Sequence, residues 1–170
     1  VSWTSTFTES NANSVSLTLL GEDVTKQKMA QDQLQQLSHA VENSQNSVMI
    51  TDIQGRIVYV NPVFNELTGY SREEVIGRTP KFLQSGEMPE SEYHHLWETL
   101  KSGNEWHGEF HNVTKNGNFF WERARISPIK DIENRILYYV AVKQDITEEK
   151  RLAKEIEHQA AERIQHEKLA

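Results

Sequence analysis

The sequence of 170 residues predicts an α+β domain that carries a helical segment at each end. Three observations lead to this fold class. Five short segments have the alternating or β-branched pattern of strands. Helix start signals stand between the second and the third of these segments, so the strands fall into a pair and a later group of three. Residues on both sides of this block have apolar side chains at helical spacing among many charged ones.

The first part of the block predicts two strands and two short helices. Residues 48–53 and 56–60 are the strands, and a tight turn that contains Gly55 joins them. Asn61 starts the first helix, because Asn is a good N-cap and the proline after it suits the first helical position. Ser71 starts the second helix, because a glutamate follows it at the spacing of a capping box.

The second part of the block predicts a loop, a longer helix and three strands. Residues 79–90 contain two prolines and a glycine, so we expect an irregular loop there. A helix follows over about residues 89–101, with an apolar face that includes Trp97. The three strands are residues 106–113, 119–129 and 135–143. The Asn-Gly pair between the first two is typical of a tight hairpin.

The two ends of the chain differ from this block. Residues 1–25 predict a β-hairpin, with residues 9–14 as its turn. Two strands alone are marginal in water, so this hairpin must pack on something else or belong to another unit. Residues 26–41 and 148–170 predict helices with a narrow apolar seam. Such a seam is typical of a coiled coil, and a surface helix packed on its own domain is the alternative that stays open.

Composition excludes several classes of function. The chain has 18 Lys and Arg against 25 Asp and Glu, a net charge of −7, which disfavours binding to a nucleic-acid backbone. It has no cysteine, which excludes disulfides, thiolate metal sites and thiol nucleophiles. No run of about 20 apolar residues could span a bilayer, and the start lacks the features of a signal peptide. We therefore expect a cytoplasmic protein without direct membrane contact.

We expect no enzymatic activity in these residues. The sequence contains no Gly-rich phosphate loop, no G-x-S-x-G motif and no H-E-x-x-H motif. Adjacent His94 and His95 raise a haem hypothesis, and His107 and His111 raise a metal hypothesis. Neighbouring helical residues point about 100° apart, so two adjacent histidines do not share one site easily. The other two histidines lack ligand partners in their sequence neighbourhood, and we expect no structural metal.

Several ordered motifs resemble those of the PAS domain. They are Ile50-Thr51-Asp52, residues 58–61, residues 67–78, Lys115-Asn116-Gly117 and residues 145–148. The resemblance covers about residues 38–150. It implies the PAS fold, a five-stranded antiparallel sheet with short helices over one face and a cavity between the helices and the sheet.

The resemblance also implies an order of domains. Residues 42–147 are expected to be the PAS domain, residues 26–41 a linker helix, and residues 148–170 a C-terminal signalling helix. Residues 21–26 resemble a second copy of the Asp-Ile-Thr ending at 145–147. Residues 1–25 are therefore expected to be the C-terminal strands of a preceding PAS domain. An output domain such as a histidine kinase or diguanylate cyclase is expected after residue 170.

A finer resemblance concerns a cofactor. Residues 77–84 resemble the loop of flavin-binding LOV-type PAS domains, but Pro80 stands where the photoreactive cysteine would be, which excludes that photochemistry. Residues 84–89, 96–97 and 106–108 together with Asn112 resemble the FAD-binding redox-sensor PAS domains of the NifL type. This implies bound FAD, with Trp97 and Asn112 at its isoalloxazine ring. The expected cofactor-binding residues are Met49, Phe82, Trp97, Trp106, Asn112 and Phe120.

An alternative without a cofactor stays open. The aromatic side chains among these residues are also those that dominate the core of a domain, and many PAS domains fill their cavity with side chains. Met49 and Pro80 stand where the FAD-binding group has polar contacts, which removes hydrogen bonds to a flavin. Haem or another small organic ligand is a further alternative.

The expected function is a sensor that relays a redox or ligand signal through its flanking helices to an output domain. Asp145 and Thr147 join the last strand to the C-terminal helix, and we expect this junction to couple the two, with the Thr147 hydroxyl bonded to the first free amides of the helix. The linker helices and the PAS domain are expected to form a homodimer. The alternative function is a cofactor-free PAS module that dimerises and relays signals from the preceding domain.

Overall fold

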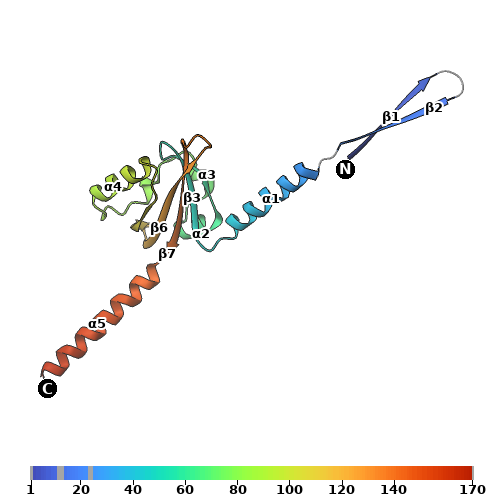
Figure 1. Cartoon of the computed structure of the whole chain (residues 1–170). Helices are drawn as coiled ribbons and strands as arrows, with labels where there is room; N and C mark the ends of the chain where they lie inside the picture. Colours follow the sequence, from blue (N-terminus) through green and yellow to red (C-terminus); the bar gives the residue numbers. More distant parts are fainter. Residues whose placement is uncertain (1, 11–13, 23–24, 170) are drawn as a thin grey trace. The chain divides into compact units, whose positions relative to one another are not determined.

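The computed structural model describes residues 2–10, 14–22 and 25–169, which divide into one unit of residues 1–41 and another of residues 42–170. In the first unit, β1 (Ser2–Ser10) and β2 (Ser14–Glu22) form an antiparallel hairpin, and α1 (Thr25–Glu42) follows (Figure 1). The expected hairpin is thus confirmed, although residues 11–13 of its turn lie outside the described residues. Its assignment to a preceding PAS domain stays a prediction.

The second unit contains a five-stranded antiparallel sheet of order β4-β3-β7-β6-β5. Its strands are β3 (Ser47–Asp52), β4 (Ile57–Val60), β5 (Trp106–Val113), β6 (Phe119–Lys130) and β7 (Ile136–Asp145). The last strand in sequence, β7, lies at the centre, between β3 and β6. This confirms the expected fold class and each of the five predicted strands. It also brings the start and the end of the domain next to each other, since β3 and β7 are neighbours.

Asn61 connects the sheet to the first helix of the domain, α2 (Pro62–Thr68). Its Oδ1 accepts hydrogen bonds from the backbone N–H groups of Phe64, at 3.2 Å, and of Val48, at 2.9 Å. The side chain is fully buried, and its amide donates to the carbonyl of Asn46. Asn61 is therefore both an N-cap and a link between α2 and β3. The helix ends at Gly69, whose φ of 78° is the left-handed conformation that glycine adopts without strain.

The capping box predicted at Ser71 is present at the start of α3 (Arg72–Val75). The backbone N–H of Ser71 donates to the carboxylate of Glu74 at 2.8 Å. The expected irregular loop over residues 79–90 differs from the structure in one respect, since residues 80–83 form a turn of 3-10 helix, η1 (Pro80–Leu83). Pro80 is compatible with this turn because its fixed φ suits the first helical position. The longer helix is α4 (Glu90–Lys101).

The core lies on the face of the sheet that the helices cover. Phe64 of α2, Leu83 of η1 and Leu100 of α4 are at most 1% exposed and pack in one cluster with residues of the sheet. Inward and outward positions alternate most clearly along β6, as the period of two requires. In β6, residues 120, 122, 124 and 126 are buried, and the residues between them face outward or are partly covered.

Gly55 occupies a position that requires a glycine, and the connection after β5 is longer than the sequence predicted. Gly55 has a φ of 78°, and a Cβ there would lie 2.9 Å from the ring of Trp97, so both the turn and the packing of α4 require a glycine. The expected tight hairpin after β5 is a five-residue connection over residues 114–118. It closes through a bond from the N–H of Gly117 to the carbonyl of Thr114 at 3.0 Å.

The last helix, α5 (Thr147–Leu169), begins directly after β7. At the other end of the unit, the Tyr59 hydroxyl of β4 donates to the carboxylate of Glu42, the first residue of this unit, at 2.7 Å. Burial, followed by this hydrogen bond, raises the pKa of Tyr59 to about 12. Among the residues that the structure describes, no helix is both long enough and apolar enough to cross a membrane.

Candidate functional site

Three polar side chains meet on the inner face of the sheet, one from each of three neighbouring strands. Asn112 of β5, Glu122 of β6 and Lys143 of β7 are 4%, 0% and 4% exposed. The Asn112 amide donates to Glu122 Oε2 at 2.8 Å, and Lys143 Nζ donates to the same oxygen at 3.0 Å. We call these three residues the buried polar cluster. Their strands are paired in register, so the backbone holds the three groups together.

The buried polar cluster leaves one acceptor unused. Glu122 Oε1 is buried and has no hydrogen-bond partner among the described residues. A buried carboxylate oxygen without a partner is costly, because it has lost its hydration and gained nothing in return. The Lys143 ammonium, which carries three donors, also lies 5.4 Å from the centre of the Phe110 ring. The cluster therefore offers an unpaired acceptor beside two groups that can donate.

Only one member of this cluster was expected from the sequence. Asn112 was among the predicted cofactor-binding residues, whereas Glu122 and Lys143 were missed. The alternating pattern of β6 nevertheless contained a signal for Glu122. Glu122 falls at an inward position between Phe120 and Ala124, where a charged residue is rare unless it is paired.

The other predicted site residues have different surroundings. Met49, Trp106 and Phe120 are each 4% exposed. Phe82 is half-buried, and its ring meets that of Tyr70 edge-on with centres 4.8 Å apart. Trp97 is also half-buried and meets the ring of Tyr139 edge-on, with centres 5.8 Å apart. All five therefore contribute to, or pack beside, the core.

Trp97 and Asn112 contact different strands of the sheet, and their expected place at one flavin ring stays a prediction. Trp97 packs on Tyr139, which stands four residues before Lys143 on β7. At about 3.3 Å per residue, Tyr139 and Lys143 lie roughly 13 Å apart along β7. Trp106 lies over the backbone of Gly108, where a Cβ would come within 2.2 Å of its ring, and packs on Phe110 with ring centres 5.1 Å apart.

The junction between β7 and α5 has a defined hydrogen-bond pattern. Asp145 Oδ1 accepts from both the N–H and the hydroxyl of Thr147, at 2.9 and 2.5 Å. The Thr147 hydroxyl oxygen accepts from the backbone N–H of Trp121 in β6 at 3.0 Å. The N–H of Ile146 donates to the carbonyl of Trp121 at 2.9 Å. The expected bond from Thr147 to the helix amides is thus replaced. Asp145 caps the helix, and Thr147 connects it to the sheet.

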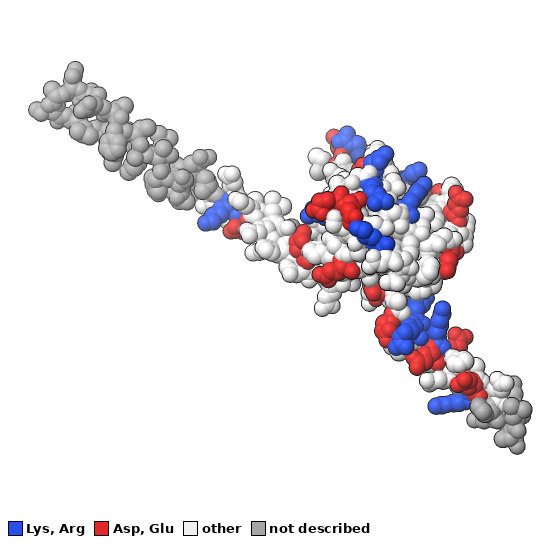
Figure 2. Space-filling model, turned by 180° about the vertical axis from the view of Figure 1, so that it is seen from behind, with Lys and Arg blue, Asp and Glu red and all other residues white. Residues whose placement is uncertain are grey.

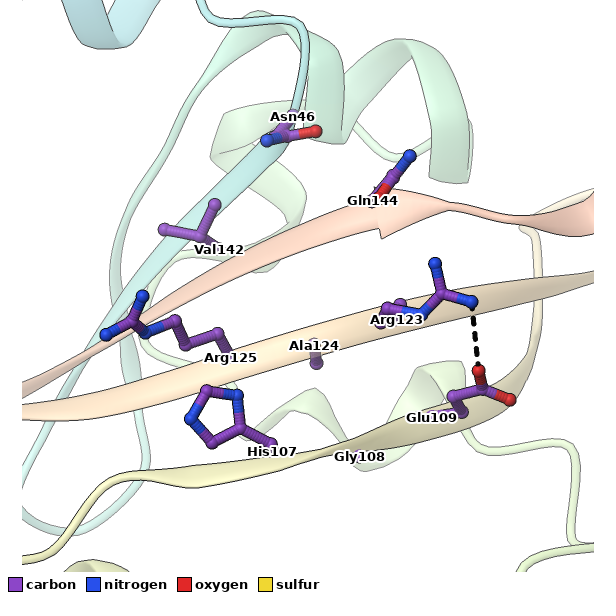
Figure 3. A pocket seen from close by; sticks show the side chains of 9 residues that line it. All are labelled: Asn46, His107, Gly108, Glu109, Arg123, Ala124, Arg125, Val142 and Gln144. Atoms are coloured by element: carbon purple, nitrogen blue, oxygen red, sulfur yellow. Dashed lines mark hydrogen bonds and ion pairs between the residues drawn. The ribbon is translucent and has the colours of Figure 1, made fainter.

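Ion pairs cover the outer face of the sheet around a shallow depression of about 440 Å³, seen in Figure 3. Glu109 of β5 pairs with Arg123 of β6 at 3.3 Å and with Lys150 of α5 at 2.6 Å. Arg123 also pairs with Glu149 of α5 at 2.8 Å. Hydrogen bonds from Arg125, then from Ser127 and His107, lower the pKa of Glu105 to about 2. The two arginines at this depression are therefore already neutralised by carboxylates.

The histidines do not form a common site in the described part of the chain. His94 and His95 are exposed, and His94 pairs with Glu98 on the same helix at 3.2 Å. His107 and His111 both lie on the outer face of the sheet. Within residues 25–165, whose side chains are described, no three His, Asp or Glu residues gather as metal ligands would. Figure 2 shows charges of both signs interspersed over the face in view.

Comparisons with known proteins agree on one family. The PAS domain family profile matches residues 45–148. A nitrogen fixation regulatory protein of Klebsiella oxytoca is 29% identical over 107 residues, which are 63% of this chain and 22% of that protein. Blue-light-activated histidine kinase 2 of Erythrobacter litoralis is 30% identical over 112 residues, 65% of this chain and 32% of that kinase.

A solved structure supports the same conclusion about the fold. The crystal structure of the PAS domain of a protein from Colwellia psychrerythraea superimposes with a TM-score of 0.60 at 27% identity, over 69% of this chain and 99% of that domain. The chain spans about a third or less of the two curated relatives described above. The comparisons therefore concern one module of longer proteins.

Proposed function

The chain belongs to the PAS domain family, and from this premise we propose that it is a sensor module that binds a flavin and relays its state to α5. The single observation that carries the proposal is the position of Glu122. Its side chain belongs to the buried polar cluster, and the residue before it, Trp121, holds the start of α5 through both its N–H and its carbonyl. One strand thus carries both the binding group and the helix attachment.

The buried polar cluster fits the polar edge of a flavin ring. That edge presents both a hydrogen-bond donor and carbonyl acceptors. Glu122 Oε1, which is unpaired, can accept from a ring N–H, and the Asn112 amide and the Lys143 ammonium can donate to ring carbonyls. A bound flavin supplies reversible redox chemistry. Met49 and Phe120 would offer apolar contacts beside the polar edge.

A relay to α5 follows from the short connection between Glu122 and the first residues of that helix. Movement of Glu122 toward or away from a ligand shifts the backbone of β6 at Trp121. Because Trp121 bonds to Ile146 and Thr147, such a shift changes the direction in which α5 leaves the sheet. A ligand can bias this change only if it binds the two arrangements with different affinity. The oxidised and reduced forms of a flavin differ in charge and hydrogen bonding and meet that condition.

For the whole protein, we propose the domain order that the sequence led us to expect. The module would lie in the cytoplasm between a preceding PAS domain and an output domain such as a histidine kinase. It would act as a homodimer through α1, α5 and the PAS domain. The match to a histidine kinase and to a regulatory protein supports this setting, without fixing the output.

Flavin uptake tests the proposal. Purified protein incubated with FAD, and separately with FMN, should retain a flavin absorbance band after gel filtration. Asn112→Ala should weaken flavin affinity about tenfold, since it removes a buried hydrogen bond. Asn116→Ala, an exposed loop change, is the matched control and should bind as the unchanged protein does. Failure of both flavins to bind at tens of micromolar would overturn the proposal.

A specific observation favours a second candidate, the cofactor-free relay module. Glu122 and Lys143 already pair with one another at 3.0 Å, and Trp97 is packed on Tyr139 and over Gly55. This arrangement is compatible with a domain whose side chains fill its own interior. Trp97→Ala separates the two candidates. If Trp97 contacts the flavin ring as expected, this change should abolish flavin retention, whereas in a cofactor-free relay it should lower only the free energy of unfolding.

A further inference from the structure

His111 on the outer face of β5 is enclosed by aromatic rings. Its ring stacks on Trp121, with centres 4.5 Å apart and planes 23° apart, and on Phe119, with centres 5.2 Å apart and planes 26° apart. Only 15% of its side chain is exposed. A cation over the face of an aromatic ring is attracted by the electron density of that ring. The two aromatic rings stacked on this imidazole can thus accommodate its protonated form.

The same histidine holds the segment that connects η1 to α4. Its Nδ1 contacts the carboxylate of Glu87. Its carbonyl accepts a hydrogen bond of 2.6 Å from the Ser85 hydroxyl, and Gln84 forms a β-bridge with Asn112. Residues 84–87 are therefore attached to β5 at three successive points. The contact between His111 and Glu87 is the one whose strength depends on a proton on the imidazole.

The other charges near His111 are already engaged. On its own strand, Glu109 pairs with Arg123 of β6 and Lys150 of α5. Lys150 Nζ lies 4.9 Å from the centre of the Trp121 ring, and Trp121 is stacked on His111. Glu87, from the segment after η1, is the carboxylate in direct contact with the imidazole. Protonation of His111 therefore strengthens the attachment of the segment, and loss of that proton weakens it.

We propose that His111 and Glu87 form a proton-controlled latch that fastens residues 84–88 to β5 when the imidazole is protonated. The latch has two neighbours that matter. Asn112, the next residue, belongs to the buried polar cluster, and Trp121 holds the start of α5. Histidine is the side chain whose charge ordinarily changes between pH 5 and 8. A change in this charge would strengthen or weaken the latch, whatever the domain binds.

Hydrogen exchange of the full chain at pH 5.5 and pH 8 tests the latch, after correction for the intrinsic pH dependence of exchange. Amides of residues 85–88 should be about threefold more protected at pH 5.5, the size expected for a partly exposed ion pair. His111→Phe retains the stacking but cannot be protonated, and Glu87→Gln retains the size of the partner but not its charge. Each should remove the difference between the two pH values.

His94→Phe is the matched control, because His94 pairs with Glu98 on an exposed helix face and lies outside the latch. It should leave the threefold difference unchanged. The latch is refuted if residues 85–88 are equally protected at both pH values, or if the difference persists in His111→Phe and Glu87→Gln. Neither variant changes a buried residue of the core, so a folded protein is expected in every arm.

Discussion

Charge inside the domain is concentrated in one pair. Lys143 and Glu122 lie 3.0 Å apart with side chains 5% and 0% exposed, whereas Lys115 and Glu74 form a pair whose side chains are 45% and 40% exposed. Two charges removed from water depend on each other, because neither can be rehydrated when the other is lost. Exposed charges are solvated by water in any case. A Lys–Glu pair therefore contributes differently to the stability of this protein when it is buried and when it is exposed.

Replacement of one member of the buried pair should be far more costly than replacement of both. We expect Lys143→Met to lower the free energy of unfolding by about 3 kcal/mol, since it leaves the Glu122 carboxylate buried without a counter-charge. The double variant Lys143→Met with Glu122→Gln should recover about 2 kcal/mol of this loss. Urea denaturation followed by circular dichroism measures both.

Lys115→Met is the control at the exposed pair, and it should cost less than about 1 kcal/mol. A cost for the double variant equal to that of Lys143→Met alone would contradict the argument. It would show that the loss comes from altered packing and not from an unpaired charge.

At the scale of elements, the junction between β7 and α5 depends on one hydroxyl. Thr147 donates to Asp145 and accepts from the N–H of Trp121, so its oxygen joins the helix to a strand that is not its sequence neighbour. Ile146, 1% exposed, anchors the same point in the core. The first turn of α5 is therefore fixed to the sheet, and its later residues are exposed through residue 165.

Removal of that hydroxyl should release the helix locally. Thr147→Val has nearly the same shape but no hydroxyl, and we expect it to lower the free energy of unfolding by about 1 kcal/mol, as for the loss of an intramolecular hydrogen bond. The amide of Trp121 and those of residues 147–150 should exchange several times faster. Thr147→Ser retains the hydroxyl and should exchange as the unchanged protein does. Equal exchange in the Val and Ser variants would contradict a role for the hydroxyl.

Local signals predicted the elements well, and they failed where the outcome depends on distant residues. Asn61 and Ser71 are caps as predicted, because capping needs only the next few residues. The role of Thr147 was predicted less well, since its partner Trp121 lies 26 positions away. The buried polar cluster was mostly missed for the same reason. No local pattern shows that residues 112, 122 and 143 face one another until the strand order is known.

At the scale of the whole molecule, α5 presents apolar residues that the described chain does not cover. Leu152, Ile156 and Ile164 are 45%, 68% and 55% exposed. On the same helix, Arg151 pairs with Glu148 and Glu155, which shows that other positions are satisfied within the helix. The expected homodimer gives these apolar residues a partner, because two such seams can face one another in a coiled coil.

Disruption of the seam should therefore dissociate the proposed dimer without unfolding the domain. Ile156→Lys places a charge where two apolar side chains would meet, and we expect the dimer dissociation constant to rise at least tenfold in sedimentation equilibrium. His158→Lys adds a charge two residues away, at a position outside the apolar series, and should leave the constant unchanged. Because Ile156 contacts no core residue in the single chain, thermal unfolding at concentrations below the constant should be the same for both variants. A dimer that persists in Ile156→Lys would assign self-association to a surface other than α5.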